Sequence, residues 1–280
     1  MEVKEKIDVS EVTNKYFIYN GEIKEADQYE NIKPTGSKLL YEVIRIIDGK
    51  PLFLKEHIER LENSIGLAEQ EITINKEGLS KDILELVKVN KVYEGNIKLI
   101  LDKENIYIFF IKHSYPSEEM YKKGVKTILY FGERENPNAK IINNQFREKV
   151  NSEIKSNNAY EAILVDRNGY ITEGSRSNIF MIKDEVVLTA PLKDVLPGIT
   201  RMKIIEACND LNLKVEEKPI SYNEINTLNG LFISGTSPKV LPINSVGDIV
   251  VKSQEDKITK KIMDKFNKII AEDIIKFKIL

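Results

Sequence analysis

One carboxylate and one lysine stand where a charge would be costly. Glu173 lies between two apolar strand segments in "ITEGSRSNIF", residues 171–180, and burying an unpaired carboxylate is unfavourable. Lys140 lies in "NPNAKIINN", directly before Ile141 and Ile142. A lysine that enters an apolar environment loses preference for its ammonium form, so its pKa falls and the amine becomes nucleophilic. A solvated side chain is the simplest interpretation of either residue alone. A functional role for them therefore depends on the other candidate residues.

Two turns rich in small residues could bind a phosphate. "LPGITR", residues 196–201, places a glycine and Thr200 ahead of a predicted helix, where free N–H groups and the helix dipole favour an anion. "ISGTSP", residues 233–238, ends a predicted strand with Thr236 and Ser237. Thr200 could equally be a helix cap, and the second stretch could be an ordinary polar turn. Neither stretch is a P-loop or a dinucleotide fingerprint.

Two arginines lie in predicted regular elements. Arg60 lies beside the apolar stripe of a predicted helix, where a snorkelling surface arginine is the simplest interpretation, and Arg45 ends a predicted strand in "YEVIR". Together, a nucleophilic lysine, a carboxylate, an arginine and two phosphate-binding turns are the parts that pyridoxal phosphate requires. The lysine forms an imine, the carboxylate keeps the pyridine nitrogen protonated, and arginine with backbone amides holds the phosphate. This cofactor would give Glu173 its cationic partner.

The composition argues against several other classes of protein. The 280 residues are 41% hydrophobic and 31% charged with a formal net charge of −2, a globular profile without the basic field that favours nucleic acids or anionic membranes. Cys208 is the single cysteine and His57 and His113 are the two histidines, so we expect no internal disulfide and no metal centre. No apolar run is long enough to span a membrane. A charged N-terminus without an apolar signal core leads us to expect a cytoplasmic protein.

Apolar spacing and turn residues predict an α+β protein. Hairpins are predicted with turns at Asn20-Gly21, Asp48-Gly49 and Asn168-Gly169, and within "NIKLILDKENIYIFFIK". Further strands are predicted at 125–131, 178–183, 185–190 and 230–234. Helices are predicted at 55–69, 76–88, 143–156 and 199–211, the last with Met202, Ile205 and Cys208 along one face. A C-terminal helix is predicted to carry Ile258, Ile262, Phe266, Ile269 and Ile274.

The elements group into two α+β domains. We expect a small N-terminal domain over residues 1–115 and a larger C-terminal domain over residues 122–280. The polar, proline-containing stretch "HSYPSEEMYKKG" places the linker at residues 116–121. The larger domain would carry most of the cofactor-binding residues.

The order of motifs resembles one enzyme family. "YEVIRIIDGKPLFLKEHIERLENS", "AILVDRNGYITEGSRSNIF", "VLPGITR" and "FISGTSPKVLPI" are similar to the class IV, or fold-type IV, pyridoxal-phosphate-dependent aminotransferases. That family includes branched-chain aminotransferases, D-amino acid aminotransferases and aminodeoxychorismate lyase. The resemblance runs from about Tyr16 to Gly247. It implies a homodimer of two-domain chains, each with a small N-terminal α/β domain, a larger C-terminal α+β domain and an active site between them.

The resemblance also implies roles for the charged candidates. Lys140 matches the lysine that bonds covalently to pyridoxal phosphate and then moves the proton of the substrate α-carbon. Glu173 matches the acidic partner of the pyridine nitrogen. Arg60 matches the phosphate-binding arginine of the "EHxxRL" helix. These three residue assignments are the most specific that the resemblance implies.

It assigns the turns and one tyrosine as well. Ile199 and Thr200 match the backbone and side-chain parts of the phosphate cradle, and Thr236 with Ser237 adds the "SGTS" turn. Tyr41 matches an active-site tyrosine of the "YEV" sequences of D-amino acid enzymes. We therefore expect these residues to bind the cofactor, and Tyr41 to face the substrate.

The chain departs from the family on the substrate side. The tyrosine that usually lies five residues after the lysine is replaced by Gln145, which follows Asn144. The Arg-Gly that often follows the strand matching "NIKLIL" is replaced by "DKEN", so an arginine that recognises the substrate carboxylate is not located there. We consider Arg45 and Arg176 as residues that could bind the substrate carboxylate instead. Arg176, inside "EGSRSN", could bind a substrate carboxylate or face outward from its turn.

These inferences favour an aminotransferase that works on an amino acid and a 2-oxo acid, branched-chain-like or D-amino-acid-like. A lyase on the same scaffold, which would eliminate pyruvate from an aminodeoxychorismate-like substrate, is the alternative among enzymes. A non-catalytic vitamin-B6-binding homologue is the alternative of another class, although such a protein would not need both Lys140 and Glu173. A triad hydrolase is weaker, because the sequence has no Gly-x-Ser-x-Gly elbow.

Overall fold

The computed structural model describes residues 12–36, 39–70, 72–134 and 137–279, and they form two compact units. The first unit extends to Ser114 and takes in Ala139–Ile142 and the chain from Ile270 onward; the second comprises Tyr115–Asn138 and Asn143–Ile269. Residues 1–11, on which the expected cytoplasmic location depended, lie outside the described residues. Within those that are described, no helix combines the length and the apolar character that a membrane span requires.

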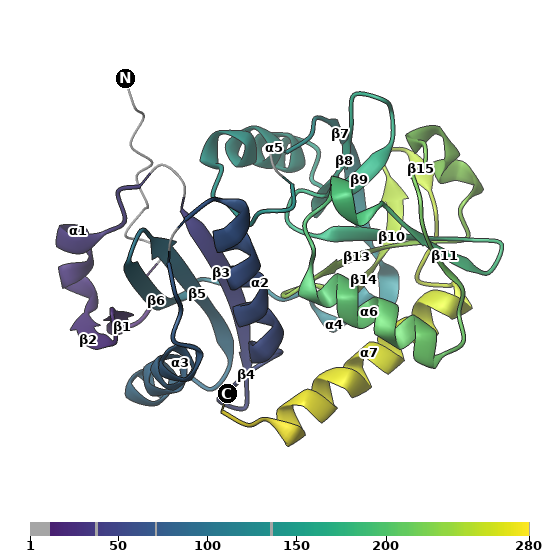
Figure 1. The fold of residues 1–280 in the computed structure, drawn as a ribbon. Coiled ribbons are helices and arrows are strands. Elements are labelled where there is room, and N and C mark those ends of the chain that lie inside the picture. The colour runs from purple at the N-terminus through teal and green to yellow at the C-terminus, as the bar shows by residue number, and fades with distance from the viewer. Residues whose placement is uncertain (1–11, 37–38, 71, 135–136, 280) are drawn as a thin grey trace. The chain divides into compact units, whose positions relative to one another are not determined.

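The first unit contains a six-stranded sheet in the order β2-β1-β6-β5-β3-β4, with every pairing antiparallel (Figure 1). Its strands are β1 (Tyr16–Tyr19), β2 (Glu22–Glu25), β3 (Leu40–Ile47), β4 (Lys50–Pro51), β5 (Gly95–Asp102) and β6 (Asn105–Ile111). Its helices are η2 (Ala26–Gln28), α1 (Tyr29–Ile32), α2 (Leu54–Leu67) and α3 (Lys76–Asn90). The sheet thus supplies a rigid support for side chains on both of its faces.

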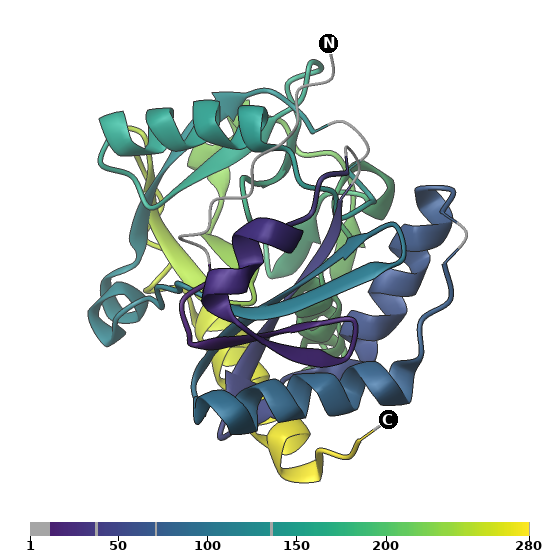
Figure 2. The same ribbon diagram turned by 90° about the vertical axis from the view of Figure 1, so that its left-hand side faces the viewer.

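Each face of this sheet has its own hydrophobic core. In β3, Leu40, Ile44 and Ile46 point to the face that α2 and α3 cover, whereas Tyr41 points to the opposite face with Tyr29 of α1. Figure 2 shows the sheet between α1 and α2. This alternation is the two-residue period of a strand. It places Glu42 on the α2 side, inside an otherwise apolar layer.

The second unit contains a nine-stranded mixed sheet in the order β12-β11-β10-β13-β14-β7-β8-β9, with β15 paired to β14. The strand β9 also pairs with β10, which closes part of the sheet into a ring. Its strands are β7 (Val125–Phe131), β8 (Glu161–Val165), β9 (Ile171–Gly174), β10 (Asn178–Lys183), β11 (Val186–Thr189), β12 (Val215–Glu217), β13 (Gly230–Gly235), β14 (Lys239–Val246) and β15 (Ile249–Val250). Because the ring closes at β9 and β10, the turn between these strands is held from both sides.

Helices cover this second sheet and extend from it. They are α4 (Glu118–Lys123), α5 (Asn144–Ser156), η3 (Leu192–Asp194), α6 (Ile199–Asp210), η4 (Tyr222–Thr227) and α7 (Lys257–Lys276). The helix α5 packs on β7 and β8 through Val150, and α6 lies against β13 through its buried residues. The helix α7 begins in the second unit and ends in the first.

The predicted α+β class and all four predicted hairpins are confirmed. The pairs β1–β2, β3–β4, β5–β6 and β8–β9 are antiparallel. Positive φ angles at Asn20, Gly21, Asp48 and Gly49 give the tight turns that Asn-Gly and Asp-Gly predict. The predicted helices correspond to α2, α3, α5, α6 and α7.

Two expectations differ from the structure. The buried face of α6 is formed by Ile204, Ala207 and Cys208. Of the predicted face, Cys208 is therefore buried, whereas Ile205 is half-buried and Met202 is exposed. Arg201 explains the rotation, because it is buried and donates to Ala190 O at 3.1 Å. The expected linker at 116–121 is mostly helix α4, since the Ser117 side chain accepts a hydrogen bond from Met120 N and caps it.

The first unit runs without interruption to Ser114, and two later segments also belong to it. Residues 139–142 join it because Leu40 and Ile141 form a bridge at the end of β3. The end of α7 joins it through Asp273, whose carboxylate accepts the Phe53 N–H at 2.9 Å. Hydrogen bonds between segments far apart in sequence have no local signal, so sequence patterns do not reveal them.

The Asp273 contact caps α2. The residue before α2, Phe53, has left-handed backbone angles (φ 53°) and supplies no side-chain cap, so Asp273 from α7 accepts the N–H instead. We expect Asp273→Ala to lower the free energy of unfolding by about 1–2 kcal/mol, because it leaves a buried N–H without this acceptor. Asp273→Asn keeps an acceptor oxygen and should lose less. Urea titration of both variants, with exposed Asp264→Ala of the same helix as control, tests this; equal stabilities of Asp273→Ala and the control would contradict it.

Candidate active site

A buried cluster of charged side chains lies between β3 and α2. Arg60 donates from Nε to Oε1 of Glu42 at 2.8 Å and from Nη2 to Oε2 at 2.5 Å. Nδ1 of His57 lies 2.7 Å from Oε2 of the same carboxylate. His57 and Arg60 are three residues apart on α2, so they share one face of the helix. The strand places Glu42 directly beneath that face.

The charges of this cluster follow from burial and contact. Burial would raise the pKa of Glu42, but the Arg60 charge and the hydrogen bonds from His57 and Arg60 outweigh it and hold that pKa well below its usual value. Burial lowers the pKa of His57, and Arg60 and Lys140 add to this effect although Glu42 opposes it. At neutral pH, Glu42 is therefore ionised and His57 is neutral, with its Nδ1–H donating to Glu42.

Lys140 is fixed at the end of the same strand. Its carbonyl accepts the Tyr41 N–H at 3.1 Å, and the Ile142 N–H donates to Leu39 O at 3.2 Å. The half-buried Lys140 side chain places Nζ 4.8 Å from the centroid of the Tyr41 ring. An ammonium over an aromatic face is favourable. The structure thus brings together two of the predicted site residues, Lys140 and Tyr41.

A buried lysine that the sequence pattern does not reveal lies near them. Lys98 of β5 is 7% exposed, and its Nζ lies 5.8 Å from the same Tyr41 ring centroid. It pairs with Val43 of β3, so Lys98 shares a face of the sheet with Tyr41 and Arg45. In "NIKLIL" the lysine stands between apolar residues. Such a pattern normally indicates a side chain that faces solvent, so the sequence does not reveal that Lys98 is buried. Both faces of this strand are buried.

In the second unit, Glu173 has a cationic partner. Its carboxylate is 4% exposed, and Oε1 lies 2.9 Å from Nε of Arg134. Its other oxygen, Oε2, accepts the Leu196 N–H at 3.0 Å. Arg134 lies in the polar loop before Lys140, and sequence analysis did not single it out. These contacts explain how a carboxylate is tolerated in this strand.

The Leu196 contact joins two sequence motifs. Nδ2 of Asn178, the last residue of "TEGSRSN", donates to Leu196 O at 3.0 Å. A Cβ added to Gly198 would lie 2.1 Å from Oδ1 of Asn178, so the loop approaches β10 in a way that only glycine permits. The "TEGSRSN" turn and the "LPGIT" loop are therefore parts of one structure.

The third motif lies at the same end of the sheet. Asn178 pairs with Ser234 across β10 and β13, and a Cβ added to Gly235 would lie 3.7 Å from the backbone oxygen of Arg176. Thr236 and Ser237, which follow, are half-buried in the turn to β14. The three motifs thus converge at one end of the second unit.

A second buried carboxylate holds the central turn. Glu161 of β8 accepts hydrogen bonds from the hydroxyl and N–H of Ser175, from the Ser177 hydroxyl and from the Ala162 N–H. Burial raises the pKa of Glu161, although these bonds oppose the shift. Glu161 therefore fixes the turn that follows Glu173. In the sequence, the role of Glu161 is indicated only by the position of a carboxylate at the start of an apolar strand.

The start of α6 suits an anion. The cap residue Gly198 provides no side-chain acceptor, and in the described part of the chain no side chain accepts from the first amides of this helix. Ile199 and Thr200 are both buried there. Amide donors that no side chain caps, together with a hydroxyl at a helix N-terminus, match a phosphate group. Beside them, Glu173 offers an anionic acceptor, so the donor set of this unit fits pyridoxal phosphate.

The remaining predicted residues have different surroundings. Arg176 is exposed and donates from Nη2 to Oδ1 of Asn151 on α5 at 3.0 Å, which supports its outward-facing alternative. Arg45 is half-buried in β3 opposite Asn96. Gln145 is exposed on α5, and the side chain of Asn144 lies outside the described part. The structure therefore gathers the predicted residues into two groups, one in each unit.

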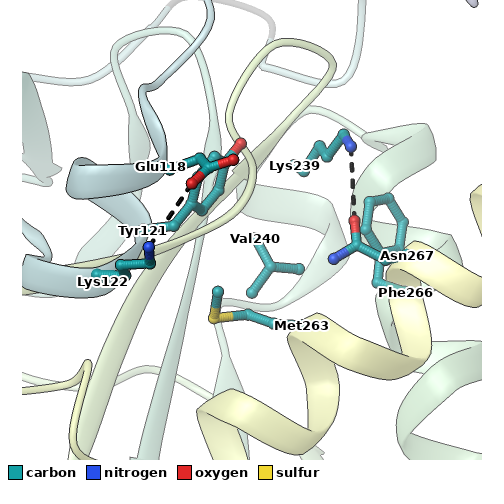
Figure 3. Close-up of a pocket in the computed structure, with 8 residues that line it drawn as sticks. All are labelled: Glu118, Tyr121, Lys122, Lys239, Val240, Met263, Phe266 and Asn267. Carbon is teal, nitrogen blue, oxygen red and sulfur yellow. Dashed lines mark hydrogen bonds and ion pairs between the residues drawn. The ribbon is translucent and has the colours of Figure 1, made fainter.

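A separate pocket of about 270 Å³ lies in the second unit among α4, α7 and the start of β14 (Figure 3). Val240, Met263 and Phe266 form its apolar part. Lys122 pairs with Glu118 at its rim, and Lys239 bonds Asn267. It contains none of the residues predicted to act in chemistry, so it is not the candidate active site.

Comparison with known proteins agrees with the motifs. The sequence model of the family described as "Amino-transferase class IV" matches residues 39–246. A Methanocaldococcus jannaschii protein, provisionally named a branched-chain-amino-acid aminotransferase, is 31% identical over 251 residues, which are 82% of this chain and 86% of that protein. The D-alanine aminotransferase of Bacillus licheniformis is 28% identical over 279 residues, 91% of this chain and 97% of that enzyme.

A solved structure supports the fold. The branched-chain amino acid aminotransferase of Escherichia coli has a TM-score of 0.81 and 24% identity, covering 92% of this chain and 95% of that one. At that identity the likeness shows the fold. The fold-type IV architecture expected from the sequence is therefore confirmed.

The contact between Gly198 and Asn178 gives a test of the joined motifs. We expect Gly198→Ala to lower the free energy of unfolding by about 1–3 kcal/mol, because the new Cβ displaces the Asn178 amide and its bond to Leu196 O. In Gly198→Ala/Asn178→Ala the clash is absent, so the two losses should not add. Urea titration of the single and double variants measures this coupling. Strictly additive losses would show that the two residues do not meet as described.

Proposed function

Because this chain belongs to the class IV aminotransferase family, we propose that it is a pyridoxal-phosphate-dependent aminotransferase that moves an amino group between an amino acid and a 2-oxo acid. The observation that carries this proposal is the bonded series Glu173–Leu196–Asn178. It fixes a buried carboxylate beside the amide-rich start of α6. A pyridine ring that carries a phosphate needs this pair of groups at its opposite ends.

We assign the cofactor contacts as follows. Glu173 accepts the hydrogen bond of the protonated pyridine nitrogen, and Arg134 keeps the carboxylate oriented. The Ile199 and Thr200 amides, the Thr200 hydroxyl and the turn at Thr236 and Ser237 hold the phosphate together with Arg60. The cofactor itself, when bound, supplies an electron sink for the substrate α-carbon.

Lys140 is the residue we assign to covalent attachment and proton transfer. Two residues before it, the Asn138 side chain donates from Nδ2 to Leu192 O at 2.8 Å and to Val195 O at 2.9 Å. Covalent geometry keeps the Cα atoms of Asn138 and Lys140 within about 7.6 Å of each other. The segment that leads into Leu196 is thus bonded to a near chain neighbour of Lys140. Released Nζ accepts the proton of the substrate α-carbon and returns it during the reaction.

Substrate recognition is the second part of the proposal. Tyr41, Lys98 and Arg45 lie on one face of the first sheet. Lys98 lies beside the Tyr41 ring and Arg45 lies further along the same face, and cations beside an aromatic ring or near it suit a carboxylate with an apolar side chain. We propose that Lys98 and Arg45 take the place of the arginine that "DKEN" lacks. Branched-chain and D-amino acids both fit, in line with the two relatives.

A lyase of the same family is the alternative, and the two reactions differ in stoichiometry. A transaminase stops after one amino group per cofactor unless a 2-oxo acid is present, whereas a lyase continues without one.

We also propose, from family membership alone, that the protein is a homodimer. Light scattering after size-exclusion chromatography measures the molar mass that tests this.

The first prediction concerns Lys140. We expect wild-type protein with pyridoxal phosphate to show a yellow absorption band that bleaches with its amino acid substrates, because the lysine amine is bonded to the cofactor. Lys140→Ala should lack the band and turn over substrate at least about 10³-fold more slowly, while exposed Lys149→Ala should behave as wild type. Visible spectra with a panel of L- and D-amino acids provide the measurement. Full turnover by Lys140→Ala would refute the assignment.

The second prediction concerns Lys98. We expect Lys98→Met to raise KM for both amino acid and 2-oxo acid by about tenfold or more, because a charge-assisted hydrogen bond to the carboxylate is lost. The yellow band should remain, since the cofactor contacts are intact. Steady-state kinetics with exposed Lys103→Met as control measure the effect. An unchanged KM would remove Lys98 from substrate recognition.

A further inference from the structure

The proposed function gives no task to Glu42, the buried carboxylate between β3 and α2. We infer that Glu42 is the positioning residue of Arg60: it fixes the orientation of the guanidinium that we assign to the cofactor phosphate. This inference rests on the proposed function, since it takes Arg60 as a phosphate ligand. Nothing in the motif resemblance assigns a role to Glu42.

The geometry of the pair defines which edge of the arginine Glu42 occupies. The carboxylate takes Nε–H at 2.8 Å and one N–H of Nη2 at 2.5 Å, the two-point arrangement that fixes a guanidinium plane. The contacts of Glu42 therefore use the Nε–Nη2 edge, so the carboxylate sets both the plane of the guanidinium and the direction in which it points. An arginine held by one contact would lack this constraint.

The partners of Glu42 are themselves held in place. Glu42 lies in the middle of β3, which pairs with β5 from Leu40 to Ile46, and the carboxylate is 1% exposed. Neutral His57 donates to Oε2 at 2.7 Å, so the carboxylate cannot rotate without losing a bond. Because the strand fixes the Glu42 carboxylate, the carboxylate restricts the position of the Arg60 guanidinium. Without it, the four rotatable bonds of the arginine side chain would leave that group free to move.

Pairing also explains how Arg60 remains in place before the phosphate arrives. Arg60 is 9% exposed, and a buried cation without an opposite charge is strongly unfavourable. Glu42 supplies that charge in the unloaded protein. The orientation is therefore established in advance, and phosphate binding requires little rearrangement of the arginine.

The test compares pyridoxal phosphate with pyridoxal, which lacks the phosphate. We propose to titrate both into wild-type protein, Glu42→Asp and Arg60→Met, each freed of cofactor, and to follow the absorption change. Glu42→Asp keeps the charge but withdraws the carboxylate by one methylene, so repulsion of the phosphate changes little while Arg60 is displaced. We expect its preference for pyridoxal phosphate to fall about tenfold or more, with pyridoxal affinity unchanged. Arg60→Met should lose the preference further.

A second variant keeps the test decisive if Glu42→Asp does not fold. His57→Phe removes the bond to Oε2 but retains a ring, and we expect a smaller loss of preference in the same direction. Thermal unfolding with inorganic phosphate alone, without cofactor, should show less stabilisation of both variants than of wild type.

The outcomes separate the inference from the proposed function. A wild-type preference that Arg60→Met abolishes, but that Glu42→Asp and His57→Phe both retain, would overturn the positioning role and leave the function standing. No preference in wild type and no effect of Arg60→Met would overturn the phosphate assignment of Arg60, and the inference with it. Equal losses of pyridoxal and pyridoxal phosphate affinity would show that Glu42 is only structural.

Discussion

The structure of the second unit depends on how the carboxylate of Glu173 is accommodated in a buried strand. One oxygen forms an ion pair with Arg134, and the other accepts a hydrogen bond from the Leu196 amide. The second bond connects β9 with the loop that begins α6, and Asn178 reinforces it through Leu196 O. Three segments far apart in sequence are thereby fixed around one charge. A buried charge imposes such an arrangement because a looser one would leave the carboxylate without opposite charge and without donors.

In the first unit, too, a buried carboxylate is neutralised by an arginine. Glu42 and Arg60 neutralise each other within an apolar layer, and neutral His57 completes the bonding. Each unit therefore holds one carboxylate–arginine pair with a buried carboxylate. In the proposed function, Glu173 would accept the hydrogen bond of the ring nitrogen and Arg60 would bind the phosphate. The cluster near Tyr41 adds Lys98 and Lys140, the cations proposed for substrate binding and catalysis.

Much of this could be predicted from the sequence. Hairpins with Asn-Gly and Asp-Gly turns are local features, and the apolar period defines α2 and α3. Lys140, Glu173 and the small-residue turns stood out because a charge or a glycine interrupts an apolar pattern. Arg134 and Asp273 did not, since their partners are distant in sequence and their own surroundings are polar. The α6 register was misjudged because the buried Arg201 resembles a surface residue until its partner Ala190 O is known.

The central claim is that Lys140 serves the same pyridoxal phosphate as Glu173. The most direct measurement is borohydride reduction of the protein with bound pyridoxal phosphate, followed by mass spectrometry of its peptides. We predict one phosphopyridoxyl group per chain, located on Lys140, and a loss of this selectivity in Glu173→Ala, which removes the acceptor for the ring nitrogen. Labelling spread over exposed lysines, or the same selective labelling in Glu173→Ala and wild type, would contradict the account.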